Sequence, residues 1–544
     1  MNSLESRTKK SMRNTAVAFA TQAVSFLCSF AVRTIVIHYL GKDYLGLSAV
    51  FQNILGILSV AETGFATVIL VSMYGPVAKN DQPKIRALLQ FYHKIYLILA
   101  CCVLAIGLCF LPWINQLSGN DPDVTGIQSV YVIIFYLESL IGTVCTYFFS
   151  YKRSLVLAYQ DKYIDNLNTL IWSIIKNTLM AIAVIVLSLR GQNHTAFLVY
   201  LAITPCIAIS ENVAITILAN KKYPIVKDGE KVFLSGKEKK KIGKDTAFLL
   251  LHKFSEAFIN STDSIIIAFF LGVSATGYYS NYLMLVTAAT TVMAIPFAQI
   301  SASIGNLVAT GDKERVYLVF RRVMFAQFFF VGVATIGLAT LTQNLISFVW
   351  LKTKVAEDPN YLLPWFVLAF QLLIFYIHMV REPIAAFKEV TKIFRYDWYF
   401  SIIRVFVNLI ISIALTLLMK KYLGWQWGIV GDLIGTLTCY LATQTWEEPF
   451  FVFKYYFEKP VSLYFKDYLL YSAVTLVVGL FSFLSVCFIP SEFGHLALNT
   501  LMFATKVLLV LMVSVGTYCA IYWKNQFFQY YKNMIKKKRK RKKQ

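Results

Sequence analysis

The residues of this sequence that are best placed to do chemistry are ionisable side chains inside long apolar runs. A charge in the middle of a hydrocarbon layer costs about 2.5–3.5 kcal/mol, so each of them needs a partner or a function. Fixed cations can bind a phosphorylated ligand, and carboxylates shielded from water can take up and release a cation. The six strongest candidates are Arg33, Lys176, Arg404, Glu62, Glu138 and Asp263.

Arg33 is expected to line a central cavity and to bind a diphosphate, with Lys176 and Arg404 adding positive charge to that cavity. A shift of the chain by 231 residues places Arg33 on Ser264, beside Asp263. Asp263 is therefore the predicted partner of Arg33 when no substrate is bound. Two alternatives stay open: a static ion pair, and an Arg33 side chain that extends along its aliphatic stem to the membrane interface.

The carboxylates are the candidates for coupling or gating. Glu62 and Asp263 are predicted to take up a proton or to respond to sodium, because desolvation favours the neutralised form of a carboxylate. Glu138 and Lys176 stand near the middle of successive apolar runs. They are expected to form a buried pair that either lines the cavity or fixes the rotation of the two helices.

Other charged residues have simpler explanations. Arg381 lies near the end of an apolar run and is expected to extend its head group to the interface. Lys253 and Glu256, three residues apart, are expected to pair on a helix surface. The nine cysteines form no CxxC pair, and the larger loops at 112–127 and 344–360 hold no cluster of His, Glu and Asp. We therefore expect no catalytic residue, no metal site and no enzymatic activity.

Membrane-spanning helices must position these side chains. The chain has 544 residues, of which 57% are hydrophobic and 15% are charged, and its mean hydropathy is +0.60. A soluble domain could not bury so much apolar surface, so we predict an all-α polytopic membrane protein with about 14 transmembrane helices. The predicted spans are 14–38, 44–73, 88–111, 128–150, 164–189, 196–219, 246–271, 277–308, 316–343, 361–387, 396–419, 426–450, 466–488 and 498–523.

The distribution of lysine and arginine indicates which ends of the spans face the cytoplasm. With the N-terminus inside, most of the 52 Lys and Arg residues fall in inner segments, and both termini are cytoplasmic. The net charge of +23 then reflects the membrane surface and not nucleic acid binding. The basic run Lys536–Lys543 is expected to meet anionic lipid headgroups. The first apolar run, 14–40, is too long for a cleavable signal peptide, so none is expected.

The sequence also indicates two copies of one unit. The 231-residue shift aligns three landmarks: Leu40-Gly41 with Leu271-Gly272, Gly46 with Gly277, and Asp81 with Asp312. Because each copy has an even number of spans, two parallel six-helix lobes in pseudo-twofold relation are expected, followed by two extra C-terminal helices. The predicted divisions are an N-terminal lobe (1–219), a cytoplasmic linker (220–245), a C-terminal lobe (246–455), two additional helices (456–523) and a basic cytoplasmic tail (524–544).

Several stretches resemble the Wzx-type flippases of capsular and exopolysaccharide repeat units, which belong to the multidrug/oligosaccharidyl-lipid/polysaccharide exporter superfamily. The stretches are YLGKDYLGL at 39–47, AETGF at 61–65, SMYGPVAKND at 72–81 and GYYSNY at 277–282, with Asn408, Ser412, Gly435 and Thr436 later in the chain. The resemblance implies an oligosaccharide on undecaprenyl diphosphate that alternating access moves from the inner to the outer leaflet of the bacterial cytoplasmic membrane. It also implies cationic lumen residues for the diphosphate, a role that suits Arg33.

On this interpretation no cofactor is expected, and an H⁺ or Na⁺ gradient is the energy source to consider. The expected partners are the lipid-linked oligosaccharide, a membrane with anionic lipids, a polysaccharide polymerase and chain-length regulators. Two alternatives stay open: a flippase for a peptidoglycan-precursor or teichoic-acid-type lipid, and a multidrug or cation exporter of the same superfamily. An exporter would favour an acidic, aromatic lumen. A glycan polymerase or ligase would need an outer catalytic loop that the sequence does not contain.

Overall fold

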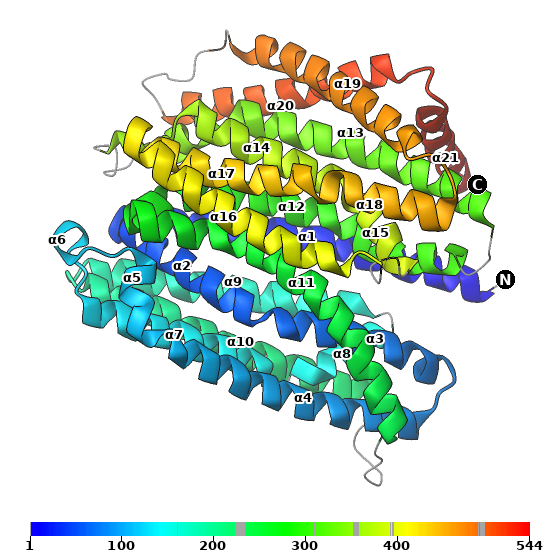
Figure 1. Cartoon of the computed structure of the whole chain (residues 1–544), viewed down its shortest axis with the longest axis horizontal. Coiled ribbons are helices and arrows are strands. Elements are labelled where there is room, and N and C mark those ends of the chain that lie inside the picture. Colours follow the sequence, from blue (N-terminus) through cyan, green and yellow to red (C-terminus); the bar gives the residue numbers. More distant parts are fainter. Residues whose placement is uncertain are drawn as a thin grey trace. The chain divides into compact units, whose positions relative to one another are not determined.

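The structure of the chain is a computed structural model that describes residues 2–148, 150–159, 161–223, 234–308, 312–351, 358–391, 393, 396–487, 489 and 496–543. Within these residues every regular element is a helix (Figure 1). The predicted all-α membrane fold is therefore confirmed. Residues 224–233 of the predicted linker lie outside the described residues.

The chain forms two compact units, each of which combines segments that are distant in sequence. The first unit contains the described residues up to Asn281, together with Asp358 and Trp398–Cys439. Its helices are α1 (Asn2–Tyr39), α2 (Lys42–Leu58), α3 (Val60–Ala78), α4 (Gln82–Cys109), α5 (Ile114–Ser118), α6 (Pro122–Thr125), α7 (Ser129–Tyr147), α8 (Arg153–Ala158), α9 (Lys162–Ser188), α10 (Asn193–Lys222), α11 (Gly236–Leu271), the start of α12 (Val273–Val308), α16 (Trp398–Leu423) and most of α17 (Trp425–Ala442). In this unit α1 packs on α9, α9 on α10, and α10 and α4 on α7, while α11 packs on α2, α3 and α16.

The second unit contains the rest of α12 and the remaining helices. These helices are α13 (Lys313–Ile346), α14 (Trp365–Val380), α15 (Glu382–Val390), α18 (Gln444–Val452), α19 (Ser462–Cys487), α20 (Leu496–Ile521) and α21 (Gln526–Lys543). Helix α13 is at the centre of this unit, because it packs against α14, α15, α19 and α20. Helix α19 also packs on α20, and α15 packs on α18.

The local geometry of the backbone repeats at the predicted spacing of 231 residues. Gly41, between α1 and α2, has φ 90° and ψ −175°, and Gly272, between α11 and α12, has φ 100° and ψ 160°. Such a conformation is open almost only to glycine, which explains why a glycine stands at both turns. Asp81 and Asp312 cap the next helices in the same way, with φ and ψ of −78° and 83°, and −79° and 85°. Each carboxylate accepts a hydrogen bond from the backbone N–H three residues later.

Eleven helices within the described ranges are long and apolar enough to cross a membrane, so the predicted number of about 14 stays a prediction. Two of the other predicted spans are broken. The span 44–73 is divided at Ser59 into α2 and α3, and the span 426–450 is divided at Thr443 into α17 and α18. The third, 277–308, lies in α12.

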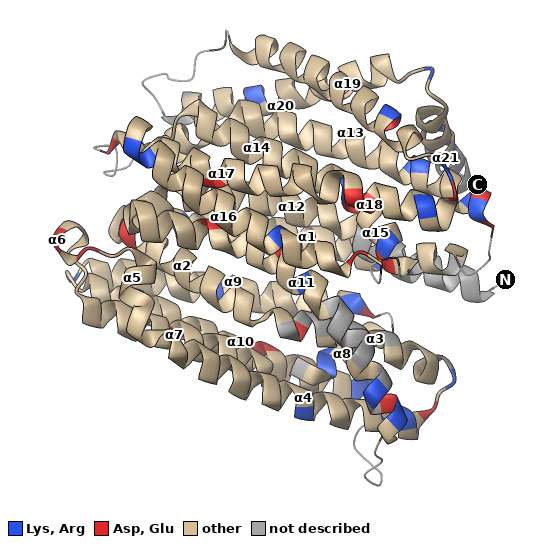
Figure 2. Cartoon of the chain, in the orientation of Figure 1, with Lys and Arg blue, Asp and Glu red and all other residues tan. Residues whose placement is uncertain are grey.

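Apolar side chains are exposed along the long helices, which indicates that these helices face lipid. Large apolar side chains are exposed on several of these helices, among them Ile98 and Ile106 of α4, Ile171 of α9 and Leu476 of α19. So many exposed apolar side chains are unusual on a protein surface that faces water. Figure 2 shows few charged residues along the middle parts of α4, α7, α9 and α10. The surface of these helices is therefore suited to hydrocarbon and not to water.

Candidate functional site

Arg33 joins the first helix of the chain to α12. Its Nε donates to Oδ1 of Asn281 at 2.7 Å, and its Nη2 donates to Oγ of Ser280 at 2.5 Å. Both partners are buried, and both belong to the GYYSNY stretch that the sequence analysis singled out. These two hydrogen bonds fix the direction of the guanidinium group. They therefore hold Arg33 as a pre-oriented cation of the kind that binds phosphate.

Asp263 has a different partner from the one predicted. Its Oδ1 accepts a hydrogen bond from the hydroxyl of Thr436 at 2.9 Å. Thr436 in turn accepts from Nδ2 of Asn408 at 2.9 Å, and Oδ1 of Asn408 accepts from Thr262 at 3.2 Å. Asp263 thus belongs to a polar chain that crosses α11, α16 and α17, and the predicted pairing of Arg33 with Asp263 is wrong. The repeat predicts a similar depth for the two residues, but it does not predict the rotation of their helices.

Asp432, a residue that the sequence analysis did not place in the site, completes this polar cluster. Its side chain is 0% exposed, and it lies close enough to Asp263 for the two carboxylates to repel each other. Neither carboxylate oxygen of Asp432 accepts a well-formed hydrogen bond, although the Ser412 hydroxyl is close by and donates to the Asp432 carbonyl at 3.1 Å. A buried carboxylate in this position needs a proton or a cation to compensate its charge.

Close helix packing explains how these polar groups meet. A Cβ added at Gly435 of α17 would lie 2.2 Å from Oγ of Ser412, and one at Gly431 would lie 2.4 Å from the carbonyl oxygen of Leu415. The two glycines therefore let the backbone of α17 contact α16 directly, as small residues do between membrane helices. This approach brings Asp432 and Thr436 against the polar face of α16.

The spacing of polar residues along the sequence could have predicted this cluster. One face of α16 carries a polar residue at every third or fourth position, and all of them are buried: Ser401, Arg404, Asn408, Ser412 and Thr416. Asp432 and Thr436 are also four residues apart, so both lie on one face of α17. A polar stripe with helical spacing inside an apolar span predicts a polar contact between helices.

The chemistry of this cluster is that of oxygen ligands. It offers two carboxylates, three hydroxyls and one amide oxygen, which suit a hard monovalent cation or a proton. No group of three or more His, Cys, Asp and Glu side chains that could hold a metal ion occurs in the described part of the chain. The expectation that the protein needs no resident metal stays a prediction.

Glu62 lies in a second charged cluster. Its carboxylate is hydrogen-bonded to the side chain of Tyr96 and lies in the field of Arg153. Arg153 also pairs with Glu211 at 2.5 Å and with Asp165 at 2.9 Å. Glu62 is therefore linked, through one arginine, to carboxylates of α9 and α10.

The other predicted residues are placed as follows. Lys176 on α9 lies in the field of Glu211, and none of the described ion pairs joins it to Glu138. The predicted Glu138–Lys176 pair is thus absent from the described ion pairs, and the role of either residue stays a prediction. Arg404 on α16 has a side chain only 2% exposed and lies on the same face as Asn408. The described contacts do not bring Arg33, Lys176 and Arg404 to one place, so their shared role in the cavity stays a prediction.

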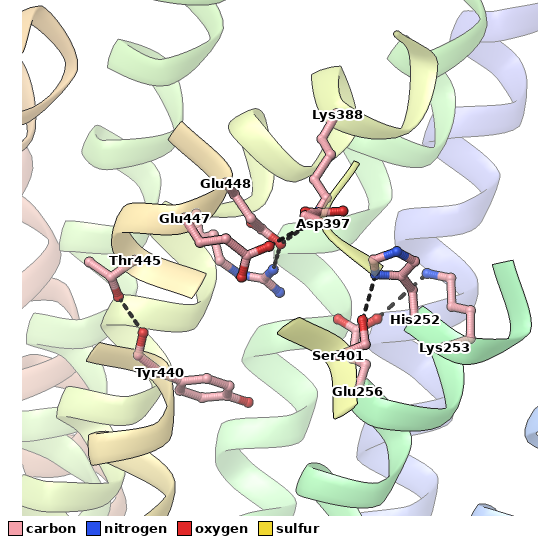
Figure 3. A network of polar contacts seen from close by, with 11 residues as sticks. His252, Lys253, Glu256, Lys388, Asp397, Ser401, Tyr440, Thr445, Glu447 and Glu448 are labelled. Atoms are coloured by element: carbon pink, nitrogen blue, oxygen red, sulfur yellow. Dashed lines mark hydrogen bonds and ion pairs between the residues drawn. The ribbon is translucent and has the colours of Figure 1, made fainter. Parts of the chain in front are cut away.

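A third charged cluster ties α15 to α18 within the second unit (Figure 3). Arg381 donates to Glu448 at 2.8 Å, and Nζ of Lys388 lies 3.3 Å from Glu448 and 3.6 Å from Glu447. Lys388 also pairs closely with Asp397. All five side chains are buried, so the prediction that Arg381 extends to the interface is wrong.

Figure 3 also shows the predicted pair of Lys253 with Glu256, at 3.6 Å, which is confirmed. His252, the residue before Lys253 on α11, is hydrogen-bonded through Nδ1 to the hydroxyl of Ser401, at 2.8 Å. This contact joins α11 to the first turn of α16. It adds to the close packing of these two helices around the Asp263 cluster.

Comparison with known proteins agrees with this architecture. Residues 11–303 match the protein family described as "Polysaccharide biosynthesis protein". No curated protein is similar enough in sequence to be matched.

Solved structures of transporters share the fold at low sequence identity. The lipid II flippase MurJ in an inward closed conformation has a TM-score of 0.60 and 14% identity, over 94% of this chain and 99% of that chain. A multidrug resistance MATE family transporter in an inward-facing conformation has a TM-score of 0.57 and 13% identity, over 80% and 97% of the chains. A MOP superfamily transporter from Pyrococcus furiosus has a TM-score of 0.53 and 13% identity, over 84% and 97%.

Proposed function

Because the chain belongs to the polysaccharide biosynthesis protein family, we propose that it is a flippase for oligosaccharide repeat units linked to undecaprenyl diphosphate. A diphosphate and a polar glycan cannot cross about 30 Å of hydrocarbon unaided. A protein that shields the head group while the lipid tail stays in the bilayer lowers that barrier. The chain is a membrane transporter and not an enzyme, since its family and its structural neighbours are flippases and transporters.

The extent of the structural matches supports a lipid-linked substrate. The lipid II flippase covers 94% of the chain, whereas the multidrug transporters cover 80–85%. The fold of the lipid II flippase therefore extends over more of this chain than the fold of the multidrug transporters does. The same observation keeps a peptidoglycan-precursor lipid as the second candidate substrate.

Arg33 supports a phosphorylated head group. Its guanidinium group is held by Ser280 and Asn281, so its direction is fixed before a ligand arrives. A planar cation with fixed direction binds two phosphate oxygens better than a flexible ammonium group does. We assign Arg33 to the diphosphate, with Lys176 and Arg404 as further cations of the path.

An apolar pocket in the second unit supports the lipid part of the substrate. Its volume is about 500 Å³, and it lies among α12, α13 and α20. Leu285, Met293, Phe329 and Phe503 are among the side chains that line it. Branched and aromatic walls of this kind suit a prenyl chain.

Transport against a concentration difference needs an energy source, and the Asp263 cluster supports a cation gradient. Two buried carboxylates repel each other unless a proton or a sodium ion binds with them. Binding and release of that cation would change the contact of α11 with α16 and α17. We propose the bacterial cytoplasmic membrane as the location, with both termini in the cytoplasm, and a polymerase and chain-length regulators as partners.

Depletion of the protein in its host tests this proposal. Lipid-linked oligosaccharide should accumulate in the inner leaflet, where an impermeant glycosidase added outside does not reach it. Accumulation of a peptidoglycan-precursor lipid in its place would identify the second candidate substrate. A host in which no lipid-linked saccharide accumulates would contradict both.

A further inference from the structure

The C-terminal helix α21 is fixed against the N-terminal part of α13, within the second unit (Figure 1). Asn525 caps its first turn, because the side-chain oxygen of Asn525 accepts the backbone N–H of Phe527 at 2.8 Å. The buried ring of Phe527 packs against Phe325 of α13, with ring centroids 6.0 Å apart. One turn later, the hydroxyl of Tyr531 donates to the carbonyl of Arg322 at 3.1 Å. Packing and hydrogen bonds therefore set the position of α21 on α13.

Helix α21 has one aromatic and apolar face and one cationic face. The helical period places Tyr530, Tyr531 and Met534 on the first face, and Lys532 and Lys536 on the second. All the charged residues of α21 are Lys or Arg. The side chains of Tyr530 and Met534 are exposed. An amphipathic cationic helix of this kind, directly after the apolar helix α20, lies at the level of the lipid head groups.

Two successive arginines of α13 contact α21, and they have different partners. The guanidinium group of Arg321 pairs with the carboxylate of Asp467, at 3.0 Å from Nε and 2.8 Å from Nη2. The guanidinium carbon of Arg322 lies 3.8 Å from the centre of the Tyr530 ring. Among the described residues no carboxylate forms an ion pair with Arg322, and its buried Nε has no hydrogen-bond acceptor. Arg322 is thus a cation that an aromatic ring orients and that can still bind an anion.

Arg322 lies on the face of α13 that lines the apolar pocket. Phe329 and Val333, which both line this pocket, follow Arg322 at the i+7 and i+11 positions, so all three residues share one face. Ala326, at the i+4 position, puts only a methyl group between them. At about 1.5 Å per residue, Arg322 is about 10 Å from Phe329 along the helix axis. A lipid whose chain occupies the pocket can therefore bring its head group to Arg322.

From these contacts we propose that Arg322, Tyr530 and the cations of α21 form a second phosphate site. This Arg322 site holds the diphosphate of an isoprenoid lipid at the inner leaflet, while the chain of the lipid lies in the apolar pocket. The inner leaflet is the side to which the distribution of Lys and Arg assigns this end of α13. The Arg322 site belongs to the second unit, whereas Arg33 belongs to the first. The proposal rests on the proposed flippase function, for which it supplies a place where the substrate is loaded.

The chemistry of the site favours a diphosphate on a single chain over a phospholipid. The Nε–H and an Nη–H of one guanidinium group can donate two parallel hydrogen bonds to phosphate oxygens. The cations of α21 add an attraction that grows with the charge of the head group, and a diphosphate carries more charge than a phosphodiester. One apolar pocket receives one chain, whereas a phospholipid brings two chains.

Binding of geranylgeranyl diphosphate to the full-length protein in phosphatidylcholine nanodiscs tests the site. Every protein carries Arg33→Ala, so that the first phosphate site does not contribute. Arg322→Gln should weaken binding by about tenfold or more, because a charge-assisted donor is lost, and Arg322→Lys should keep part of the affinity. Lys313→Gln is the matched control, since Lys313 lies on the opposite face of α13, in an exposed pair with Glu458. Equal affinities of Arg322→Gln and Lys313→Gln, or no saturable binding before either change, would overturn the proposal.

Gly337→Leu tests the position of the chain. Gly337 lines the pocket and nothing lies within 4 Å of a Cβ there, so leucine fills the pocket without a clash. The variant should bind geranylgeranyl diphosphate about fivefold or more weakly and should bind inorganic diphosphate unchanged. Gly516→Leu is the control, because a Cβ at Gly516 also meets open space but does not line the pocket. Equal affinity of both variants for geranylgeranyl diphosphate would show that the chain lies elsewhere and would overturn the proposal.

Competition identifies the lipid that the site selects. Phosphatidylglycerol, added to the nanodiscs at the mole fraction of geranylgeranyl diphosphate, should displace little of it. Equal competition would show a general surface for anionic lipids and would overturn the assignment to an isoprenoid diphosphate. No transport is measured, so this result is independent of the depletion experiment. Arg322-dependent binding without accumulation of a lipid-linked saccharide would reject the proposed function and leave the site, and accumulation without such binding would do the reverse.

Discussion

Asp432→Asn is the sharpest test of the Asp263 cluster, because it removes a charge and almost no volume. Two like charges about 4–6 Å apart repel by roughly 3–4 kcal/mol at an effective dielectric constant of 20. Asp432 is fully buried and lies in the field of Asp263, so the ionised pair bears this cost when no cation is bound. The amide of the variant keeps the shape of the side chain and carries no charge. In sodium-free buffer at alkaline pH, the variant should therefore be more stable than the native protein, by up to that amount.

Thermal unfolding of the reconstituted protein measures this effect. Sodium or acid should stabilise the native protein, and a ligand at 100 times its dissociation constant adds about 2.7 kcal/mol. Asp432→Asn should lose that increment. Thr340→Val is the control, because the Thr340 hydroxyl bonds carbonyls of its own helix and the variant is nearly isosteric. It should keep the sodium or acid increment of the native protein.

The reasoning would be refuted by an Asp432→Asn protein that gains as much stability from sodium or from acid as the native protein does. It would also be refuted by a variant that is less stable than the native protein in sodium-free alkaline buffer. The first result would mean that the cation binds elsewhere. The second would mean that Asp432 is compensated in the empty protein.

Three further predictions concern other charged residues. Arg33→Lys should keep more flux of lipid-linked oligosaccharide than Arg33→Ala, since a cation remains; equal, near-native flux in both would remove Arg33 from the diphosphate site. Glu448→Gln should lower the free energy of unfolding by about 1.5–3 kcal/mol, because it replaces the charged hydrogen bond from Arg381 by a neutral one, whereas Glu458→Gln, at an exposed pair, should cost less than about 1 kcal/mol in the same denaturation assay. Burial raises the pKa of the Asp43 carboxyl group. The folded protein therefore binds the proton of this group more firmly than the unfolded chain does. The contribution of the protonated group to the free energy of unfolding is lost as pH rises through the raised pKa. The melting temperature of Asp43→Asn minus that of the native protein should therefore increase with pH, and a pH-independent difference would contradict this sign.

The repeat could be predicted from the sequence because it is fixed by residues with backbone roles. Gly41 and Gly272 stand where φ is positive, and Asp81 and Asp312 stand where a helix begins. Such requirements are local, so the residue type and the conformation go together. The 231-residue shift therefore located equivalent turns even though few of the residues between them are identical.

The partners of the charged residues could not be predicted in the same way. A partner depends on the rotation of one helix relative to another that is distant in sequence, and hydropathy does not determine this rotation. Arg33 and Asp263 were placed at similar depth, but Arg33 bonds Ser280 and Asn281, and Asp263 bonds Thr436. The polar stripe on α16 would have been a better guide, because a spacing of four residues does specify a face.

The two copies share the residues that build the turns and differ in the residues that carry charge. The 231-residue shift places Arg33 on Ser264, Glu62 on Met293, and Asp263 on Val32. The pre-oriented cation therefore belongs to the first copy, and the pair of repelling carboxylates belongs to the second. A ligand bound by the first and a cation bound by the second can influence each other only if the copies move as connected bodies. Helix α11, which carries Asp263, packs on α2 and α3 of the first copy, so this packing is a direct physical connection between the two copies.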